Sequence, residues 1–309
     1  MRILILGSSG FLGKNLSNTL KKSKNNTVIE HNSKICNLLS FDNTSKFIKE
    51  SKADFIINCA GKVGGILSHI GNNYEYLLTN TIINFNLING LVENDIKNFI
   101  NVSSSCAYPL NITQPFKEED YGYSKQFEPT NEGYAISKQL VNQLLTYLKT
   151  ENNIDFKTII PCNLYGEHDN FSKTKSHLIS AIIMKIHEYK IGKTNEITIL
   201  GSGNPIRQFS YVKDLCNFIT FSIKNYKKLP KNINFASGNS YSVNQYYKKI
   251  SKIILNKNIK FNYDKSKPDG VFSKNIDNKR LLSLGFKKFT NFDSSVKNTY
   301  KYYKNSLND

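Results

Sequence analysis

Tyr134 and Lys138 lie four residues apart in the segment YAISK (residues 134–138), and a run of small polar residues, SSSC, lies upstream at residues 103–106. Together these residue types suit a hydride-transfer site. On a helix, positions i and i+4 share one face, so the Lys138 ammonium can approach the Tyr134 phenol and lower its pKa from a reference of about 10. A phenol tuned in this way is a usable acid near neutral pH. The same spacing is common on solvated helix faces, so other features must support a catalytic role.

A glycine-rich turn supports that role. The segment GSSGFLG (residues 7–13) follows an apolar β-run and opens a predicted helix. Gly7 permits a tight turn, Gly10 lets backbone amides approach a pyrophosphate, and Gly13 lets the helix pack close to the sheet. The helix N-terminus adds unpaired N–H groups and a partial positive charge. A glycine trio alone is weak evidence, but its position between a strand and a helix predicts a dinucleotide site.

The end of the second predicted strand bears on the choice of dinucleotide. An acidic residue there, Glu30, favours a free ribose 2′-hydroxyl and therefore NADH. Glu30 is followed by HNSK (residues 31–34), whose neutral donors and lysine are better suited to a 2′-phosphate. Because Glu30 can point elsewhere, we expect NADPH to be preferred, with NADH left as the alternative.

The composition is that of an ordinary soluble globular protein. The 309 residues are 39% hydrophobic and 21% charged, with no apolar run long enough to cross a bilayer, and leave room for two unequal domains. The opening β-run at residues 2–6 is predicted to be a buried strand, unlike an export signal. The five cysteines are scattered, with no C-x-x-C pair and no zinc-like grouping with the five histidines. We therefore expect reduced thiols, no metal site and a cytoplasmic location.

The formal charge of +18 first suggests a nucleic-acid or lipid surface as partner. The lysines, however, are spread along the whole chain, with no block of five basic residues and no recognised nucleic-acid module. We expect no nucleic-acid partner and no membrane partner. The charge is better matched to a phosphate-bearing small molecule.

Short β-rich runs alternate with longer helical segments, which predicts βαβ units on a parallel sheet. The expected strands are 2–6, 27–30, 54–59, 97–103 and 156–161, and the expected helices are 11–22, 43–50, 73–93 and 134–150. After residue 161 the pattern loosens, and we expect strands at 197–200, 231–235 and 258–263 with helices at 211–225 and 242–255. The predicted fold is a doubly wound parallel α/β sheet of the Rossmann type with a second, smaller α/β substrate domain. We expect the dinucleotide domain to comprise residues 1–163 plus about 208–236, and the nucleotide-sugar domain about 164–207 plus 237–309.

Several longer stretches make the chain resemble GDP-L-fucose synthase, a subgroup of the extended short-chain dehydrogenase/reductases. The resemblance runs from about residue 1 to about 290 and rests on NCAGKVGG (58–65), SSCAYP (104–109), EPTNEGYA (128–135) and NLYGEHDNF (163–171). In that family a GDP-4-keto-6-deoxy-mannose is epimerised at C3 and C5 and then reduced at C4 by NADPH. The family forms a cytoplasmic homodimer through two helices, which correspond here to about 78–93 and 134–150.

The resemblance implies roles for individual residues. It assigns Ser104, Tyr134 and Lys138 to the reduction, and Cys106 and His177 to the epimerisation. It implies a cofactor site made of Gly7, Gly10, Phe11, Leu12, Gly13, Ala60, Lys62, Asn80, Tyr134, Lys138, Pro161, Asn163, Leu164 and His177. It implies a substrate site made of Ser105, Cys106, Asn163, Lys185, Arg207 and Lys274, with a turn at KPDG (267–270) close by. Lys185 departs from the arginine that is more usual in the family.

Three questions stay open at this stage. The sugar could be a hexose, the family default, or a heptose destined for surface polysaccharide. Cys106 and His177 could still epimerise the sugar, or could only position it in a pure C4 reductase. A non-catalytic regulatory protein that kept the glycine turn is the alternative from another class, but such relatives commonly lose the pair formed by Tyr134 and Lys138. The remaining histidines are interpreted as structural or surface groups: His31, His69, His168 and His187.

Overall fold

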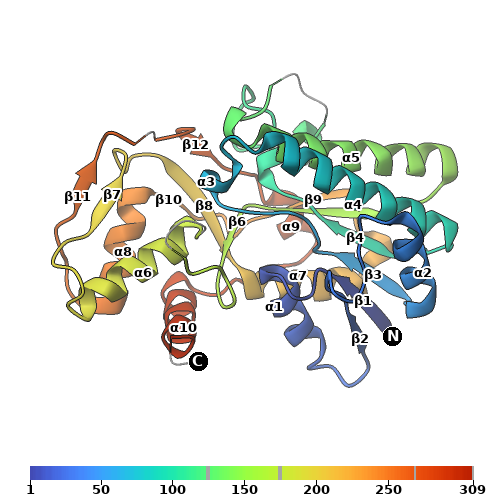
Figure 1. Ribbon diagram of the computed structural model, residues 1–309, viewed down its shortest axis with the longest axis horizontal. Coiled ribbons are helices and arrows are strands. Elements are labelled where there is room, and N and C mark those ends of the chain that lie inside the picture. The colour runs from blue at the N-terminus through green and yellow to red at the C-terminus, as the bar shows by residue number, and fades with distance from the viewer. Residues whose placement is uncertain (123–125, 173–175, 268, 308–309) are drawn as a thin grey trace.

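The computed structural model describes residues 1–122, 126–172, 176–267 and 269–307. Its centre is a six-stranded parallel sheet with the strand order β2-β1-β3-β4-β5-β9 (Figure 1). The strands are β1 (Arg2–Leu6), β2 (Thr27–Glu30), β3 (Phe55–Asn58), β4 (Phe99–Val102), β5 (Lys157–Pro161) and β9 (Asn232–Phe235). Strands β1, β3, β4 and β5 are short runs of mostly apolar residues, typical of strands that are covered on both faces.

Helices cover both faces of this sheet. On one face, alternate strand residues such as Ile3 and Ile57 form a core with α1 (Phe11–Leu20), α7 (Val212–Lys224) and α9 (Lys279–Ser283). On the other face, residues such as Leu4 and Ile56 pack against the helices α2 (Phe41–Ser51), α4 (Asn73–Glu93) and α5 (Glu132–Asn152). The two long helices α4 and α5 lie side by side (Figure 1). The predicted doubly wound parallel sheet is therefore confirmed.

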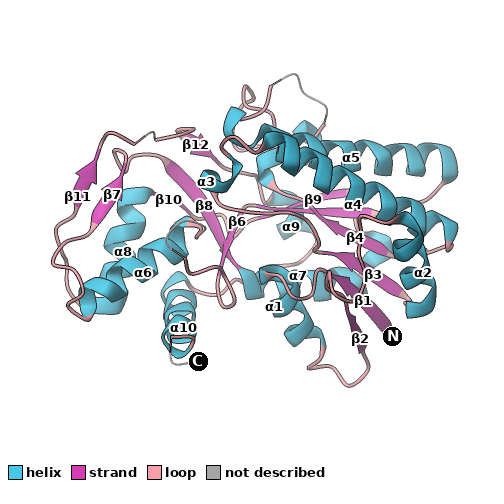
Figure 2. Cartoon of the chain, in the orientation of Figure 1, coloured by secondary structure: helices cyan, strands magenta, loops and turns pink. Residues whose placement is uncertain are grey.

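The remaining elements build a second region beside the sheet (Figure 2). Strand β8 (Ile206–Tyr211) pairs with β6 (Asn163–Tyr165), β10 (Ser240–Ser242) and β12 (Ser273–Lys274), and β7 (Thr198–Leu200) pairs with β11 (Asn262–Asp264). A separate apolar core joins β6, β7 and β8 to the helices α6 (Leu178–Lys190), α8 (Val243–Leu255) and α10 (Phe292–Asn305). The division of the chain at the residues given above stays a prediction.

In the first half, the predicted elements agree with the structure to within about two residues at most ends. The short helix α3 (Ile66–His69) was not expected. In the second half, the sequence patterns missed α6, α10 and β8, and the expected strand at 258–263 is reduced to Asn262–Asp264. All five cysteines are free thiols. Within the described ranges, no helix combines the length and the apolar character needed to span a bilayer.

Candidate active site

The glycine turn between β1 and α1 is constrained by close backbone contacts. Gly7 has φ +74°, and a Cβ atom there would lie 2.8 Å from the backbone of Ala60. A Cβ atom on Gly13 would lie 2.1 Å from the Gly7 carbonyl oxygen. Helix α1 starts at Phe11, and its N-cap residue, Gly10, has no side chain that could accept a hydrogen bond. The first N–H groups of the helix are therefore left without a side-chain partner. This donor set fits the pyrophosphate of a dinucleotide.

Glu30, at the end of β2, is held against α1. Its carboxylate accepts a hydrogen bond from the Ser17 hydroxyl at 2.5 Å and pairs with the Lys21 ammonium at 2.8 Å. The contact with Lys21 lowers the pKa of Glu30 most, and the contact with Ser17 lowers it further. His31 is buried, with its ring between the Gly7 N–H and the Cys36 carbonyl. The exposed Ser33 and Lys34, which follow β2, could therefore contact a ribose phosphate.

Tyr134 and Lys138 lie in the first turns of α5, and both side chains are buried. The Lys138 Nζ lies 5.5 Å from the centre of the Tyr134 ring, over its face, and donates a hydrogen bond to the Val102 carbonyl at 3.3 Å. Burial lowers the pKa of Lys138 to about 8. The predicted proximity of the two side chains is therefore present, but the ammonium faces the ring and not the hydroxyl.

The predicted direction of the Tyr134 pKa is wrong. Burial raises the pKa of Tyr134, and the nearby Cys106 adds to the rise, while a hydrogen bond with Ser104 opposes it. Removing the phenolate from water costs more than the ring-facing ammonium recovers. A phenol with a raised pKa keeps its proton throughout the physiological range, which is the state that a proton donor needs.

Ser104 and Cys106 are placed beside Tyr134 by a short 3-10 turn, η1 (Ser105–Ala107), that follows β4. The Ser104 hydroxyl caps this turn by accepting a hydrogen bond from the Cys106 N–H at 3.1 Å. Ser105 is buried, whereas the Cys106 thiol is half-buried. The structure thus brings the serine run to the phenol.

His177 caps the N-terminus of α6, and its Nδ1 lies 3.3 Å from Oδ1 of Asp169. Asp169 also accepts hydrogen bonds from the Ser180 hydroxyl and from the Asn170 N–H. The contact with Asp169 raises the pKa of His177. Asp169 stands in the segment NLYGEHDNF, but nothing in the sequence alone singled it out as a partner of His177.

One neighbour of Tyr134, His69, was not predicted from the sequence. The buried His69 ring lies 5.6 Å from the Tyr134 ring, edge to face, and interacts electrostatically with Glu128 and His177. Nε2 of His69 bonds to the Gly64 carbonyl, and none of the described residues offers a partner to its Nδ1. The Glu128 carboxylate also interacts electrostatically with the Arg207 guanidinium. His69 is therefore a neighbour of the candidate site, in addition to any structural role.

Most of the other predicted cofactor residues lie at or just after the carboxyl ends of the central strands, where doubly wound sheets bind dinucleotides, and Asn80 lies on α4. The Asn80 side chain accepts from the Lys62 N–H at 2.8 Å and donates to the Lys62 carbonyl at 3.1 Å, which ties the loop after β3 to α4. Ala60 lies in that loop, Pro161 ends β5, and Asn163 and Leu164 begin β6.

Two of the three predicted substrate cations lie side by side. Arg207 on β8 and Lys274 on β12 are direct partners in a parallel pairing, so their side chains project from the same face. The Arg207 guanidinium donates to the Asp269 carbonyl at 3.3 Å. Lys185 on α6 instead donates to the Thr198 carbonyl at 2.6 Å. Of the predicted turn at 267–270, Pro268 lies outside the described residues.

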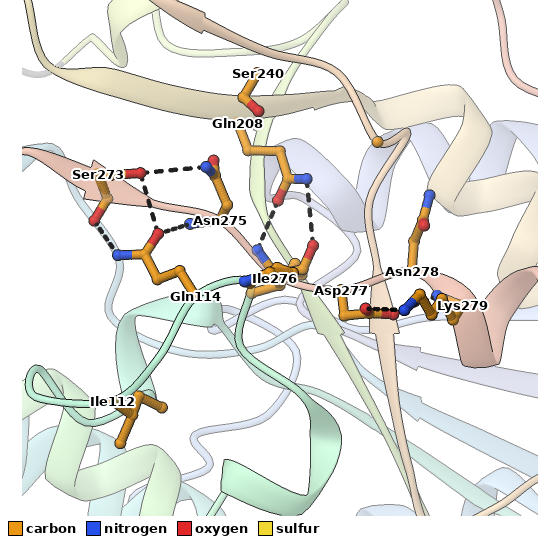
Figure 3. Close-up of a pocket in the computed structure, with 12 residues that line it drawn as sticks. Ile112, Gln114, Gln208, Ser240, Ser273, Asn275, Ile276, Asp277, Asn278 and Lys279 are labelled. Carbon is orange, nitrogen blue, oxygen red and sulfur yellow. Dashed lines mark hydrogen bonds and ion pairs between the residues drawn. The ribbon is translucent and has the colours of Figure 1, made fainter.

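A cavity of about 670 Å³ lies on the other side of the β8–β12 layer (Figure 3). Gln208, Ser273 and Asn275 line it. Gln208 directly follows Arg207 in the chain, and Ser273 and Asn275 directly precede and follow Lys274, so their side chains project from the opposite face of the strands. Gln114 joins this wall through hydrogen bonds to Ser273 and Asn275. The cavity is thus separated from Arg207 and Lys274 by the strands themselves, and none of the predicted site residues lines it.

Comparison with known proteins gives consistent matches along the chain. The sequence model described as NAD dependent epimerase/dehydratase family matches residues 3–237. The chain is 39% identical to the GDP-L-colitose synthase of Yersinia pseudotuberculosis, with 100% of each chain covered. It is 32% identical to the GDP-L-fucose synthase of Azorhizobium caulinodans, over 98% of this chain and 96% of the relative. A solved GDP-L-fucose synthetase from Naegleria fowleri, bound to NADP, has the same fold, with a TM-score of 0.87 at 22% identity over 99% of this chain and 95% of the other.

Proposed function

Because this chain belongs to the NAD dependent epimerase/dehydratase family, and within it to the GDP-L-fucose synthase subgroup, we propose that it reduces the C4 ketone of a GDP-linked 4-keto-6-deoxy sugar with NADPH. The observation that carries the proposal is the grouping of Ser104, Tyr134 and Lys138 at the end of β4 and the start of α5. A sugar of this kind serves surface polysaccharide synthesis. A non-catalytic role would leave this grouping without a purpose.

The reduction needs a proton and a hydrogen bond at the C4 oxygen. Bound NADPH supplies the hydride, so negative charge develops on that oxygen. Tyr134, held protonated by its burial, donates the proton, and the Ser104 hydroxyl donates a stabilising hydrogen bond. The Lys138 ammonium would hold a ribose of the bound cofactor. It also lies over the Tyr134 ring and so favours negative charge there.

The corner at the end of β2 supports NADPH over NADH. Glu30 is engaged by Ser17 and Lys21, and so is not directed at a ribose hydroxyl. The exposed Lys34 supplies a positive charge for a 2′-phosphate. A comparison of the Michaelis constants for the two cofactors tests this, and a clear preference for NADH would contradict it.

Cys106 and His177 support an epimerisation that precedes the reduction. Protons on carbons beside a ketone are acidic enough for a positioned side chain to remove, and return of a proton to the opposite face inverts the centre. Contact with Asp169 raises the pKa of His177 and so favours the protonated imidazole. This makes His177 the proton donor and leaves Cys106 as the base.

Among hexoses, fucose and colitose are the two candidates for the sugar. Fucose carries a hydroxyl at C3, so a fucose precursor has two centres beside the ketone to invert. Colitose has no hydroxyl at C3, so only C5 would need inversion. The full-length match at 39% identity to a GDP-L-colitose synthase favours this second candidate. For either sugar, Arg207 and Lys274 provide adjacent cations for the GDP diphosphate.

The protein is also proposed to act as a homodimer through α4 and α5. Exposed apolar residues follow a seven-residue spacing along α4, at Leu78, Phe85 and Val92, and along α5, at Leu140 and Tyr147. Residues seven apart return to the same side of a helix, so each helix carries an apolar stripe. Two such helices, packed side by side, match their counterparts in a second copy as a helix bundle.

The experiment is incubation with candidate GDP-4-keto sugars and NADPH in deuterated water, followed by NMR of the product. Deuterium at C5, with or without C3, and a reduced C4 is the expected result. A reduced C4 without deuterium would mean that the protein is a pure reductase. Turnover only with a heptose would mean that the substrate is a heptose and not a hexose. Consumption of no sugar would overturn the proposal. Cys106→Ser is the matched variant, since it should stop deuterium uptake and spare reduction of a pre-epimerised sugar.

A further inference from the structure

The carboxylate of Asp169 is buried beside His177, with only 1% of its side chain exposed. It accepts hydrogen bonds from the Ser180 hydroxyl, from the Asn170 N–H at 2.8 Å and from Nδ1 of His177 at 3.3 Å. Ser180 belongs to the first turn of α6, so the carboxylate stands at the positive end of that helix. Asp169 is therefore fixed in place by groups other than His177.

A buried carboxylate is stable only when its charge is compensated. The N-terminus of α6 supplies part of the compensation, and His177 is the ion-pair partner of Asp169 within the described residues. His69 of α3 interacts electrostatically with His177 and opposes its positive charge, while Glu128 interacts with His69 in the opposite sense. Of these groups, Asp169 is the one in direct contact with the His177 ring, and this contact stabilises a charged imidazole.

The hydrogen bond also fixes the orientation of the ring. A carboxylate only accepts, so Nδ1 of His177 must carry the hydrogen. Resting on the function proposed above, we propose that Asp169 is a positioning residue for the epimerisation, which holds Nδ1–H of His177 toward α6 and turns Nε2 toward the sugar. Neutral histidine free in water favours the other tautomer, so this state has to be imposed by the fold.

The proton movements balance as follows. The Cys106 thiolate removes a proton from a carbon beside C4 and becomes a thiol, while the C–H electron pair passes to the C4 oxygen as an enolate. The enolate carbon takes a proton from Nε2 of the imidazolium on the opposite face, and His177 becomes neutral. Exchange with water then removes the thiol proton and returns one to Nε2. Asp169 stays ionised throughout and exchanges no proton.

The first test needs no substrate. NMR of the protein labelled with ¹⁵N-histidine should find neutral His177 with its hydrogen on Nδ1, and Asp169→Asn should lower the pKa of His177. A hydrogen on Nε2 in the wild-type protein, or an unchanged pKa in the variant, would overturn the proposal. Ser180→Ala provides a second variant if Asp169→Asn does not fold, because it loosens the carboxylate without touching His177, and it should lower the same pKa by less.

The second test measures deuterium uptake into a GDP-4-keto sugar. Asp169→Asn should slow uptake by about 10² to 10⁴, the range that general acid–base catalysis by a positioned side chain contributes. Reduction of a pre-epimerised sugar should keep its kcat and KM, and Asp169→Glu should restore part of the uptake. Asp42→Asn, an exposed carboxylate in the first turn of α2, is the control and should match the wild-type protein. Uptake by Asp169→Asn at the wild-type rate would contradict the proposal.

The two tests separate this inference from the proposed function. If the wild-type protein takes up no deuterium with any sugar, the epimerisation fails. The NMR result still decides whether Asp169 sets the tautomer and the pKa of His177. If uptake occurs but is insensitive to Asp169, the positioning role fails and the proposed function stands.

Discussion

The Lys138 ammonium lies over the face of the Tyr134 ring, 5.5 Å from its centre, and donates its hydrogen bond to the Val102 carbonyl. It therefore stabilises the site through the ring face and leaves the phenol hydroxyl to Ser104. This arrangement divides the work between the two residues. Under the proposed function, Tyr134 would donate the proton and Lys138 would supply the cation that holds the cofactor ribose.

Cofactor affinity should depend on pH through Lys138. Burial lowers the pKa of Lys138 to about 8, and a lysine is cationic below its pKa, so its charge is lost as the pH rises through about 8. The Kd for NADPH should therefore rise above pH 8, by up to about tenfold per pH unit while the bound lysine keeps its proton. Fluorescence titration between pH 6 and 10 measures this. Lys138→Met should bind weakly with little change in this range, and a flat wild-type profile to pH 9.5 would contradict the assignment.

Tyr134→Phe should lose the reduction. The ring packs against His69 and Tyr76, and phenylalanine preserves those contacts, so the fold should be unchanged. Loss of the general acid should lower kcat by about 10² to 10⁴. Single-turnover reduction of a pre-epimerised sugar is the measurement, with NADPH affinity and thermal unfolding as controls. A loss of less than tenfold would mean that another group donates the proton.

Arg207 and Lys185 should differ in their effect on substrate binding. Arg207 stands next to Lys274, whereas the Lys185 ammonium is already bonded to the Thr198 carbonyl. A charged hydrogen bond contributes about 1.5–3 kcal/mol, so Arg207→Ala should raise the KM of the GDP-sugar by about tenfold or more. Lys185→Gln should raise it much less. Equal effects in steady-state kinetics would show that Lys185 leaves Thr198 when the substrate binds.

The apolar stripes on α4 and α5 predict a dissociable dimer. Phe85→Glu places a charge in the middle of the α4 stripe and should yield a monomer in analytical ultracentrifugation, because an unpaired charge is costly to bury. Ile191→Glu removes a more exposed apolar side chain just beyond the end of α6 and should leave the mass unchanged. A wild-type monomer, or a dimer that survives Phe85→Glu, would place the interface elsewhere.

The cofactor half could be predicted from sequence because its signals are local. The glycine turn lies between β1 and α1 as expected, and Tyr134 and Lys138 share one helix. The direction of the Tyr134 pKa could not be predicted, because it depends on how completely distant segments bury the ring. The partnership of His177 with Asp169 was also missed, since it depends on the conformation of the loop between β6 and α6.

The second region was harder to predict from sequence because contacts between distant segments determine its elements. Strand β8 pairs with β6, β10 and β12, and these three strands come from widely separated parts of the sequence. Strand β12 has only two residues. Helix α10 carries a narrow apolar face among many polar residues, and it is fixed by packing against the core that contains Tyr165 and Tyr246. Non-local pairing and packing select these elements, and residue periodicity alone does not reveal them.

Reduction at C4 is tested by transfer of label from NADPH that carries deuterium at the reactive nicotinamide position. The reaction is run in ordinary water with a GDP-4-keto-6-deoxy sugar, and the product is analysed by NMR. One deuterium at C4 of the sugar is expected, and this signal should be lost in Tyr134→Phe. Label that remains in the cofactor while the sugar is unchanged, or that appears at a carbon other than C4, would contradict reduction at C4.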